Sequence, residues 1–295
     1  MKNSQVRLNC GITMPVLGLG TYSFENDRDV TEQAVHAALK MGYRHFDTAK
    51  IYGSEPAVGS ALTEAILNQV VDRDDVFVTS KLWSSDHSDP VAALKRTLKN
   101  LGMQYLDMYL VHWPVKLKPW ACYPLPNEED FEKLDLDWAY RCIGVSNFSS
   151  KKIQWLSGFA SVTPAVNQVA NHLNCIQNLK GKELGIELSD YRIHVSAYSP
   201  LGGPGNSWGS TAVVENPIIQ SIAYKHNATP AQVPSKKMFS FCCPKWGLSK
   251  GSSVIVKSFN QSRMKENMGH LTSGNSCNHT TSPYRTLEDL WDDEI

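Results

Sequence analysis

Eight short runs rich in β-forming residues recur along the chain, and most of them are separated by segments with the pattern of an amphipathic helix. The runs cover residues 16–19, 44–47, 76–80, 108–112, 142–146, 165–169, 194–199 and 253–257. Strands that alternate with helices form parallel sheets, and eight such units predict a closed α/β barrel, the (β/α)8 or TIM-barrel fold. Barrels of this kind commonly use 250 or more residues, so the 295 residues are expected to form one domain over 1–295.

Two helices have recognisable starts. Asp89-Pro90 and Asn216-Pro217 each place an N-cap residue before a proline at the first helical position. Gly102 is suited to end the first of these helices.

Nearly every predicted strand ends on a polar side chain. In a TIM barrel the carboxyl ends of the strands form the catalytic face, whereas interior positions are filled by apolar side chains. The strand-end residues are Asp47, Lys81, His112, Ser146, Asn147, Gln168, Tyr198, Ser199, Lys257 and Ser258. We therefore expect these side chains to form a functional site at this end of the barrel rather than to be ordinary polar residues of loops.

Four side chains meet the requirements of a proton-transfer site. An isolated tyrosine has a pKa near 10 and gives up a proton poorly at neutral pH unless a cation stabilises the phenolate. A buried lysine in turn needs a carboxylate to stay charged. Tyr52, Lys81 and Asp47 supply these groups, with His112 as a further partner. Taken singly, each is also explained by packing or by a structural ion pair; the four together favour catalysis.

Charge and cysteine content exclude several classes of protein. Lys plus Arg and Asp plus Glu number 29 each, so no large field of one sign attracts nucleic acid or an anionic membrane. The seven cysteines lack the paired spacing of a zinc or redox site. No signal peptide or membrane-spanning stretch is recognisable in the sequence. We expect a cytosolic protein in a reducing environment.

A phosphate-binding segment follows the last predicted strand. No Gly-x-Gly-x-x-Gly motif follows a strand, which argues against a Rossmann site. Lys257 and Ser258 instead precede a helix whose N-terminal amides favour anions. Arg263 adds a forked donor suited to a 2′-phosphate. The alternative is a solvated, charged helix start.

These motifs resemble those of the aldo-keto reductase family, and specifically its plant group that includes methylecgonone, codeinone and chalcone reductases. The segment 42–59 and the surroundings of Lys81, His112 and Lys257 carry the resemblance. It implies a (β/α)8 barrel and NADPH-dependent reduction of an aldehyde or ketone to an alcohol, without a metal. Tyr52 would then be the general acid, Lys81 paired with Asp47 would lower its pKa, and His112 would orient the carbonyl oxygen.

The same resemblance implies a set of residues that hold NADPH. Lys257, Ser258, Asn260, Arg263, Glu266 and Asn267 would contact the adenosine phosphate and adenine. Ser146, Asn147 and Gln168 would hold the nicotinamide carboxamide, and Tyr198 would stack on its ring. Thr21, Tyr22 and Asp47 would lie along the cofactor, with Ser199 and Leu201 near its pyrophosphate.

Aromatic side chains in strand-end loops indicate the substrate. Tyr22, Trp83, Trp113 and Trp120, with His112, are expected to line an apolar pocket. We therefore expect a bulky small-molecule ketone, such as an alkaloid or polyketide of plant secondary metabolism, and a monomeric enzyme.

Four segments depart from the pattern of the family. Near 138–142 the outer helix between the fourth and fifth strands is short, and 170–190 is poorly patterned. An insertion at 234–244, bracketed by Pro234 and Pro244, interrupts the helix before the eighth strand. Within an altered tail, 268–295, the Gly-, Ser-, Asn- and Thr-rich stretch 269–279 is expected to be a flexible link.

These departures leave three alternatives to an active reductase. The chain could be a catalytically impaired splice or gene-model variant, a non-catalytic NADPH-binding protein, or a chain that does not fold stably, because a domain's stability is only about 5–15 kcal/mol. Retention of all four catalytic residues argues against the non-catalytic alternative.

Overall fold

The structure is a computed structural model of the chain. It describes residues 5–23, 25, 27–121, 126–133, 144–170, 192–203, 209–225 and 252–272.

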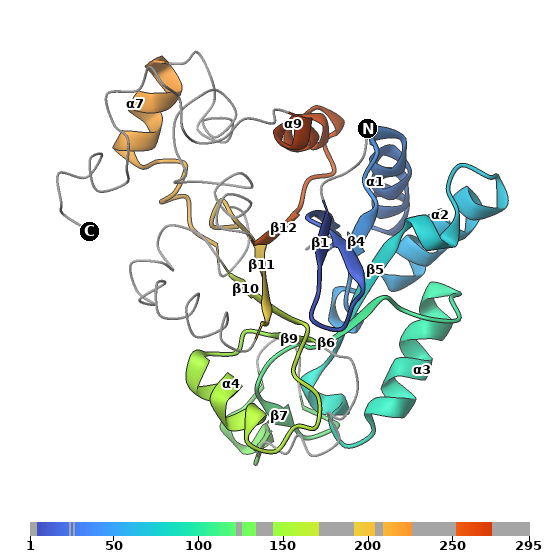
Figure 1. The fold of residues 1–295 in the computed structure, drawn as a ribbon, viewed down its shortest axis with the longest axis vertical. Helices are drawn as coiled ribbons and strands as arrows, with labels where there is room; N and C mark the ends of the chain where they lie inside the picture. Colours follow the sequence, from blue (N-terminus) through green and yellow to red (C-terminus); the bar gives the residue numbers. More distant parts are fainter. Residues whose placement is uncertain are drawn as a thin grey trace.

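Eight parallel strands close into a barrel (Figure 1). The strands around the barrel are β3 (Leu17–Gly20), β4 (His45–Asp47), β5 (Phe77–Leu82), β6 (Met108–Val111), β9 (Gly144–Ser146), β10 (Val166–Ala170), β11 (His194–Tyr198) and β12 (Ser253–Val256), which pairs with β3 again. The eight predicted strands are confirmed, each boundary within two residues.

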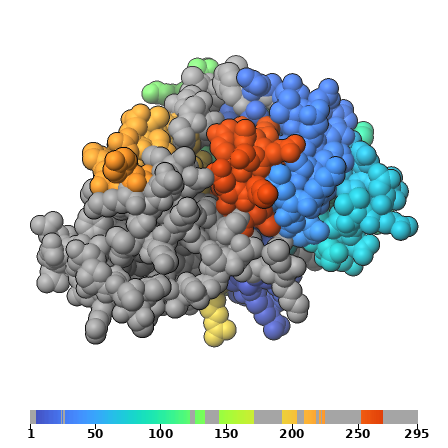
Figure 2. Space-filling model, turned by 90° about the horizontal axis from the view of Figure 1, so that it is seen from above, coloured from blue at the N-terminus to red at the C-terminus, as the bar shows by residue number. Residues whose placement is uncertain are grey.

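The described residues also form α-helices outside the barrel. They are α1 (Arg28–Met41), α2 (Glu55–Leu67), α3 (Pro90–Leu101), α4 (Ser150–Ser157), α7 (Pro217–Lys225) and α9 (Gln261–Thr272). Figure 1 shows α1, α2 and α3 following one another beside the strands, and Figure 2 shows α9 packed next to α1. The apolar faces of α1 and α2 and the strands they cover share one buried core, which includes Leu19, Phe46, Val58 and Val78.

The predicted boundaries of α3 are confirmed. The Asp89 carboxylate accepts a hydrogen bond of 2.9 Å from the backbone N–H of Ala92. Gly102 adopts a left-handed conformation with φ of 63°, and its N–H donates to the last carbonyls of the helix. The partner helix α2 approaches the end of α3 so closely that a Cβ on Gly59 would lie 2.2 Å from the backbone oxygen of Leu101. Glycine at position 59 is thus a packing requirement.

A hairpin that the sequence did not predict closes the amino end of the barrel. Strands β1 (Gln5–Arg7) and β2 (Thr13–Pro15) pair antiparallel. Leu8 and Met14 pack against Phe77, Met108 and neighbouring residues, several of which begin barrel strands. The hairpin leaves the carboxyl ends of the strands as the end available for a site.

The crossover between β6 and β9 is described only in part. A small hairpin, β7 (Lys116–Leu117) with β8 (Phe131–Glu132), and the 3₁₀ turn η4 (Glu128–Asp130) occupy it. No α-helix forms within 112–121 or 126–133. The predicted short helix near 138–142, the segment 171–190 and the insertion at 234–244 lie outside the described residues.

The expected flexible link at 269–279 is wrong at its start. Helix α9 continues through Thr272, so residues 269–272 are helical despite the glycine and threonine among them. The helix propensity of single residues is a weak signal compared with the packing of a helix that has already formed. The remainder of the tail, 273–295, is outside the described residues.

Candidate active site

A buried ion pair lies at the carboxyl ends of β4 and β5. The ammonium of Lys81 donates to Asp47 Oδ1 at 2.5 Å and to the backbone oxygen of Thr48 at 3.0 Å. Gln168, from β10 across the barrel, donates from Nε2 to Asp47 Oδ2 at 2.7 Å. Burial lowers the pKa of Lys81, and the adjacent Asp47 carboxylate opposes this shift. The carboxylate therefore holds a cation where burial alone would remove it.

A second buried carboxylate, which was not among the predicted site residues, supports Lys81. Glu55, the first residue of α2, accepts hydrogen bonds from Ser80 at 2.8 Å and from Asn100 at 2.9 Å. Its charge also raises the pKa of Lys81. Its place in the same 42–59 segment as Asp47 and Tyr52 was the only available signal.

Tyr52 lies directly against this cation. It ends the 3₁₀ turn η1 (Lys50–Tyr52), and Gly53, with φ of 66°, turns the chain from η1 into α2. The Lys81 ammonium is 4.8 Å from the centre of the Tyr52 ring. Tyr22 and His112 contact the same ring edge-to-face, with centroids 5.2 and 5.6 Å away. The structure thus brings the predicted tetrad of Asp47, Tyr52, Lys81 and His112 together.

His112 is a buried, neutral imidazole. Burial, and secondarily the nearby Lys81 charge, lowers its pKa well below the ordinary value for histidine. Its Nδ1 is buried with no hydrogen-bond partner. A bare lone pair is better tolerated there than an unpaired N–H, so we assign the proton to Nε2. The ring is then a neutral hydrogen-bond donor.

Two of the predicted pocket aromatics pack on His112. Trp83 meets it edge-to-face at 5.4 Å, and Trp113, which is 41% exposed, stacks on it at 6.5 Å. Trp120 lies in the connection between β7 and β8, is 75% exposed, and has the Lys118 ammonium 6.0 Å from its ring centre. Among the described contacts Trp120 thus has none with the tetrad, and its place in the pocket stays a prediction.

Amide and hydroxyl groups gather at the ends of β9, β10 and β11. Ser146 donates to the backbone oxygen of Gln168 at 2.8 Å, and Asn147 Nδ2 donates to the backbone oxygen of His112 at 3.0 Å. The Tyr198 hydroxyl donates to Asn147 Oδ1 at 2.8 Å. Asn147 adopts a left-handed φ of 63°, a strained conformation that is frequent at functional sites. These four predicted residues form one hydrogen-bonded group.

Three hydroxyls link the Asp47 loop to the preceding strand. Ser54 Oγ is 2.8 Å from Thr21 Oγ1 and 2.8 Å from Thr48 Oγ1, and Thr21 also donates to the backbone oxygen of Asp47 at 2.9 Å. The Thr21 side chain is buried and fixes the Asp47 loop, and its place along the cofactor stays a prediction. Ser54 and Thr48 were not predicted, because no sequence pattern marks such contacts.

The basic segment after β12 places the charges of Lys257 and Arg263 near the N-terminus of α9. Asn260 caps α9 by accepting from the backbone N–H of Arg263 at 3.1 Å, and its own N–H donates to the buried Ser258 hydroxyl at 3.2 Å. Partial burial and then the neighbouring Arg263 charge lower the pKa of Lys257, which Glu25 opposes. A bound phosphate would offset the repulsion between these two cations at the helix N-terminus.

The remaining predicted cofactor residues are near these groups along the chain. Glu266 and Asn267 are half-buried on α9, and Asn267 hydrogen-bonds Tyr43. Ser199, with a left-handed φ of 47°, and half-buried Leu201 follow β11, where Gly202 N–H donates to the Ser199 oxygen at 2.9 Å. Their contacts with a cofactor stay predictions.

Within the described residues, no helix has the length and apolar character needed to cross a bilayer.

A model of the aldo/keto reductase family matches residues 16–275. The 7-acetyl-epi-neemfruitin B aldo-keto reductase of Melia azedarach is 38% identical over 320 residues, which cover 97% of this chain and 95% of the relative. Deoxymugineic acid synthase 1-A of Triticum aestivum is 38% identical over 318 residues, covering 96% and 97%. Among solved structures, a Bombyx mori aldo-keto reductase in complex with NADP superposes with a TM-score of 0.77 at 29% identity, covering 94% of this chain and 90% of the other.

Proposed function

Because this chain belongs to the aldo/keto reductase family, we propose that it reduces a bulky ketone of plant secondary metabolism to an alcohol, with NADPH as the reductant. The observation that carries this proposal is the contact of the Tyr52 ring with the buried Asp47–Lys81 pair. The neutral His112 ring contacts the same Tyr52 ring edge-to-face. We further propose that the protein acts as a cytosolic monomer.

The residues present fit NADP(H). Lys257, Ser258 and Arg263 would hold the adenosine phosphate, since two cations and helix N-terminal amides meet there. The group of Ser146, Asn147 and Gln168 offers the donors and acceptors that an amide requires, and Tyr198 joins it. When bound, the cofactor supplies hydride to the carbonyl carbon.

The chain supplies the proton. Tyr52 would donate its hydroxyl proton to the carbonyl oxygen as that oxygen gains charge, and the Lys81 cation would stabilise the phenolate left behind. Asp47 keeps Lys81 charged, and Gln168 holds the other Asp47 oxygen. These contacts leave the cation directed at Tyr52 before substrate arrives.

His112 would donate from Nε2 to the same carbonyl oxygen. A neutral imidazole orients the oxygen and stabilises developing negative charge without competing with Tyr52 as the acid. Trp83, Trp113 and Tyr22 around His112 and Tyr52 favour an apolar, bulky carbonyl compound. The Melia azedarach relative, an aldo-keto reductase named for 7-acetyl-epi-neemfruitin B, supports a plant small molecule as the substrate.

A fluorescence titration with NADPH, with NADH as comparison, tests the cofactor site first. Tight, saturable binding that favours NADPH is expected. NADPH oxidation with a panel of bulky ketones then tests the reaction: Tyr52→Phe should lower turnover by roughly 10²–10⁴-fold while leaving NADPH affinity nearly unchanged. Tyr224→Phe, at an 89% exposed position on α7, is the matched control.

Three results separate an active reductase from the non-catalytic and the impaired alternatives. Unchanged turnover in Tyr52→Phe contradicts the proposed acid. Tight NADPH binding without turnover of any ketone or aldehyde indicates a non-catalytic NADPH-binding protein. A soluble protein that binds no NADPH indicates an impaired variant in which the catalytic residues are relics.

A further inference from the structure

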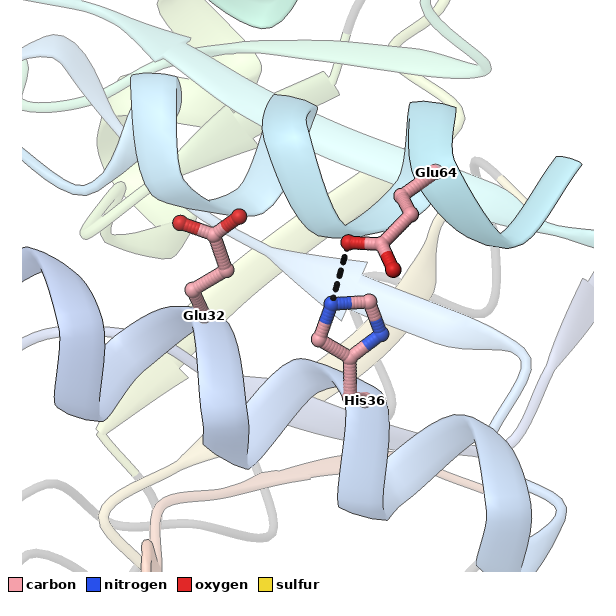
Figure 3. A group of neighbouring side chains, drawn as sticks. All are labelled: Glu32, His36 and Glu64. Atoms are coloured by element: carbon pink, nitrogen blue, oxygen red, sulfur yellow. Dashed lines mark ion pairs between the residues drawn. The ribbon is translucent and has the colours of Figure 1, made fainter. Parts of the chain in front are cut away.

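Three metal-ligating side chains face one another between α1 and α2 (Figure 3). Glu32 and His36 are four residues apart on α1, so they project from the same face of the helix. Glu64 comes from α2 and reaches toward them. We propose that Glu32, His36 and Glu64 form a binding site for a first-row transition-metal dication such as Zn²⁺, which would link the two helices. The cluster belongs to the outer helices, and none of the residues proposed for ketone reduction is part of it.

The distances suit such an ion. The ligand atoms of the three residues all lie within 4.8 Å of one another. Metal–ligand bonds of about 2.0–2.2 Å in a tetrahedral arrangement place ligand atoms roughly 3.3–3.6 Å apart. His36 Nε2 and Glu64 Oε2 are already 3.2 Å apart, so one pair of ligands needs no rearrangement. Only the Glu32 carboxylate must move toward the other two.

The surroundings of Glu32 support its role as a ligand. Its Oε1 accepts a hydrogen bond of 2.5 Å from Ser60 on α2, which leaves Oε2 free to turn toward an ion. Carboxylate ligands held by such a second contact are typical of metal sites. The competing cation, Arg28, is 3.9 Å from Oε2 and its side chain is 64% exposed. Exposed pairs of this kind contribute little to stability, so Arg28 can be displaced.

A cavity beside the cluster provides room for water ligands. It has a volume of about 660 Å³ and is lined by His36 and Glu64 together with Gln33, Asn68 and Gln261. Three protein ligands leave a fourth position on a tetrahedral ion, which water would fill from this cavity. An imidazole among two carboxylates favours Zn²⁺, Co²⁺ or Ni²⁺ over Mg²⁺ and Ca²⁺, which prefer all-oxygen sites.

Isothermal titration of the full-length, chelator-treated protein with ZnCl₂ tests the proposal. We expect a binding event in the wild type that is at least tenfold weaker in His36→Ala and in Glu64→Gln. Gln33→Ala, which alters the same cavity without removing a ligand, should bind as the wild type does. Because sites elsewhere in the chain contribute equally to every variant, the difference between variants reports this cluster.

Two further measurements make the test decisive. Far-UV circular dichroism shows whether the variants fold, and Glu64→Gln is a safe change because its side chain is 58% exposed. Co²⁺ should give visible absorption bands in the wild type that Glu64→Gln reduces severalfold. Equal zinc affinity and equal cobalt spectra in folded wild-type and Glu64→Gln proteins would overturn the proposal. NADPH affinity is expected to be unchanged throughout, which separates this test from that of the proposed function.

Discussion

Asp47 accepts hydrogen bonds on both carboxylate oxygens, from Lys81 on one and from Gln168 on the other. Asp47→Asn would leave the Lys81 ammonium buried without its charge partner. Removing one member of a buried ion pair typically costs about 3–5 kcal/mol. We expect Asp47→Asn to lower the free energy of unfolding by that amount in urea titrations, and to lower turnover because Lys81 no longer stays charged. Asp72→Asn, at an exposed position, is the control and should change neither.

The lowered pKa of His112 predicts how kcat/KM depends on pH. Burial and the Lys81 charge hold its pKa well below the ordinary value, so its protonation state is constant across neutral pH. We expect kcat/KM to show no inflection from His112 between about pH 5.5 and 7.5, where an ordinary histidine titrates. An inflection in that range that disappears in His112→Asn would show that the imidazole titrates there, contrary to a neutral donor.

Three members of the proposed catalytic tetrad could be predicted because each combines a polar residue type with the end of a strand, whereas Tyr52 lies in the turn η1. Asp47, Lys81 and His112 are polar where packing alone would place apolar side chains. Glu55 and Ser54 could not be predicted in the same way, because their roles depend on which side chains α2 places against β5 and β3. Such contacts are three-dimensional and leave no periodic trace in the sequence.

Helix caps provide a test of local structure. The carboxylates of Asp27 and Asp89 accept from backbone N–H groups at the starts of α1 and α3, at 3.0 and 2.9 Å. Asp72 precedes the 3₁₀ turn η2 (Arg73–Asp75), but its side chain makes no capping bond. Loss of a cap costs about 1 kcal/mol. Asp27→Ala and Asp89→Ala should each lower the unfolding free energy by about this amount in urea, whereas Asp72→Ala should stay within about 0.5 kcal/mol of wild type.

The elements that the sequence predicted well carry strong local signals. Buried barrel strands read as short apolar runs, and Asp89-Pro90 with Gly102 marks both ends of α3. The β1–β2 hairpin was missed because β1 is exposed or half-buried along its length and lacks the apolar run that marks a buried barrel strand. Residues 269–272 were misassigned because the composition of the tail was weighed without the packing of α9 against α1.

Burial of histidines makes the folded state of the whole molecule sensitive to acid. His45 bonds to Thr79 at 2.9 Å and lies near the Pro15 oxygen at 3.3 Å, inside the barrel wall. Burial lowers its pKa to about 4, against the opposing effect of Asp47. Burial also lowers the pKa of His87 and of His194 to about 4 each, with Lys116 and His45 adding to the respective shifts. In the unfolded chain all three return to about 6.5.

The sign of the pH dependence follows from these values. Between about pH 6.5 and 4 the unfolded chain binds protons that the folded barrel does not accept, so stability falls as pH falls. Each histidine contributes a slope of up to about 1.4 kcal/mol per pH unit. Urea titrations above about pH 5 isolate this effect, because ordinary carboxyl groups titrate mainly below it. Replacing His45 with Gln removes one titrating group, so the slope of unfolding free energy against pH should become shallower. An equal slope in His45→Gln would show that other groups cause the acid sensitivity.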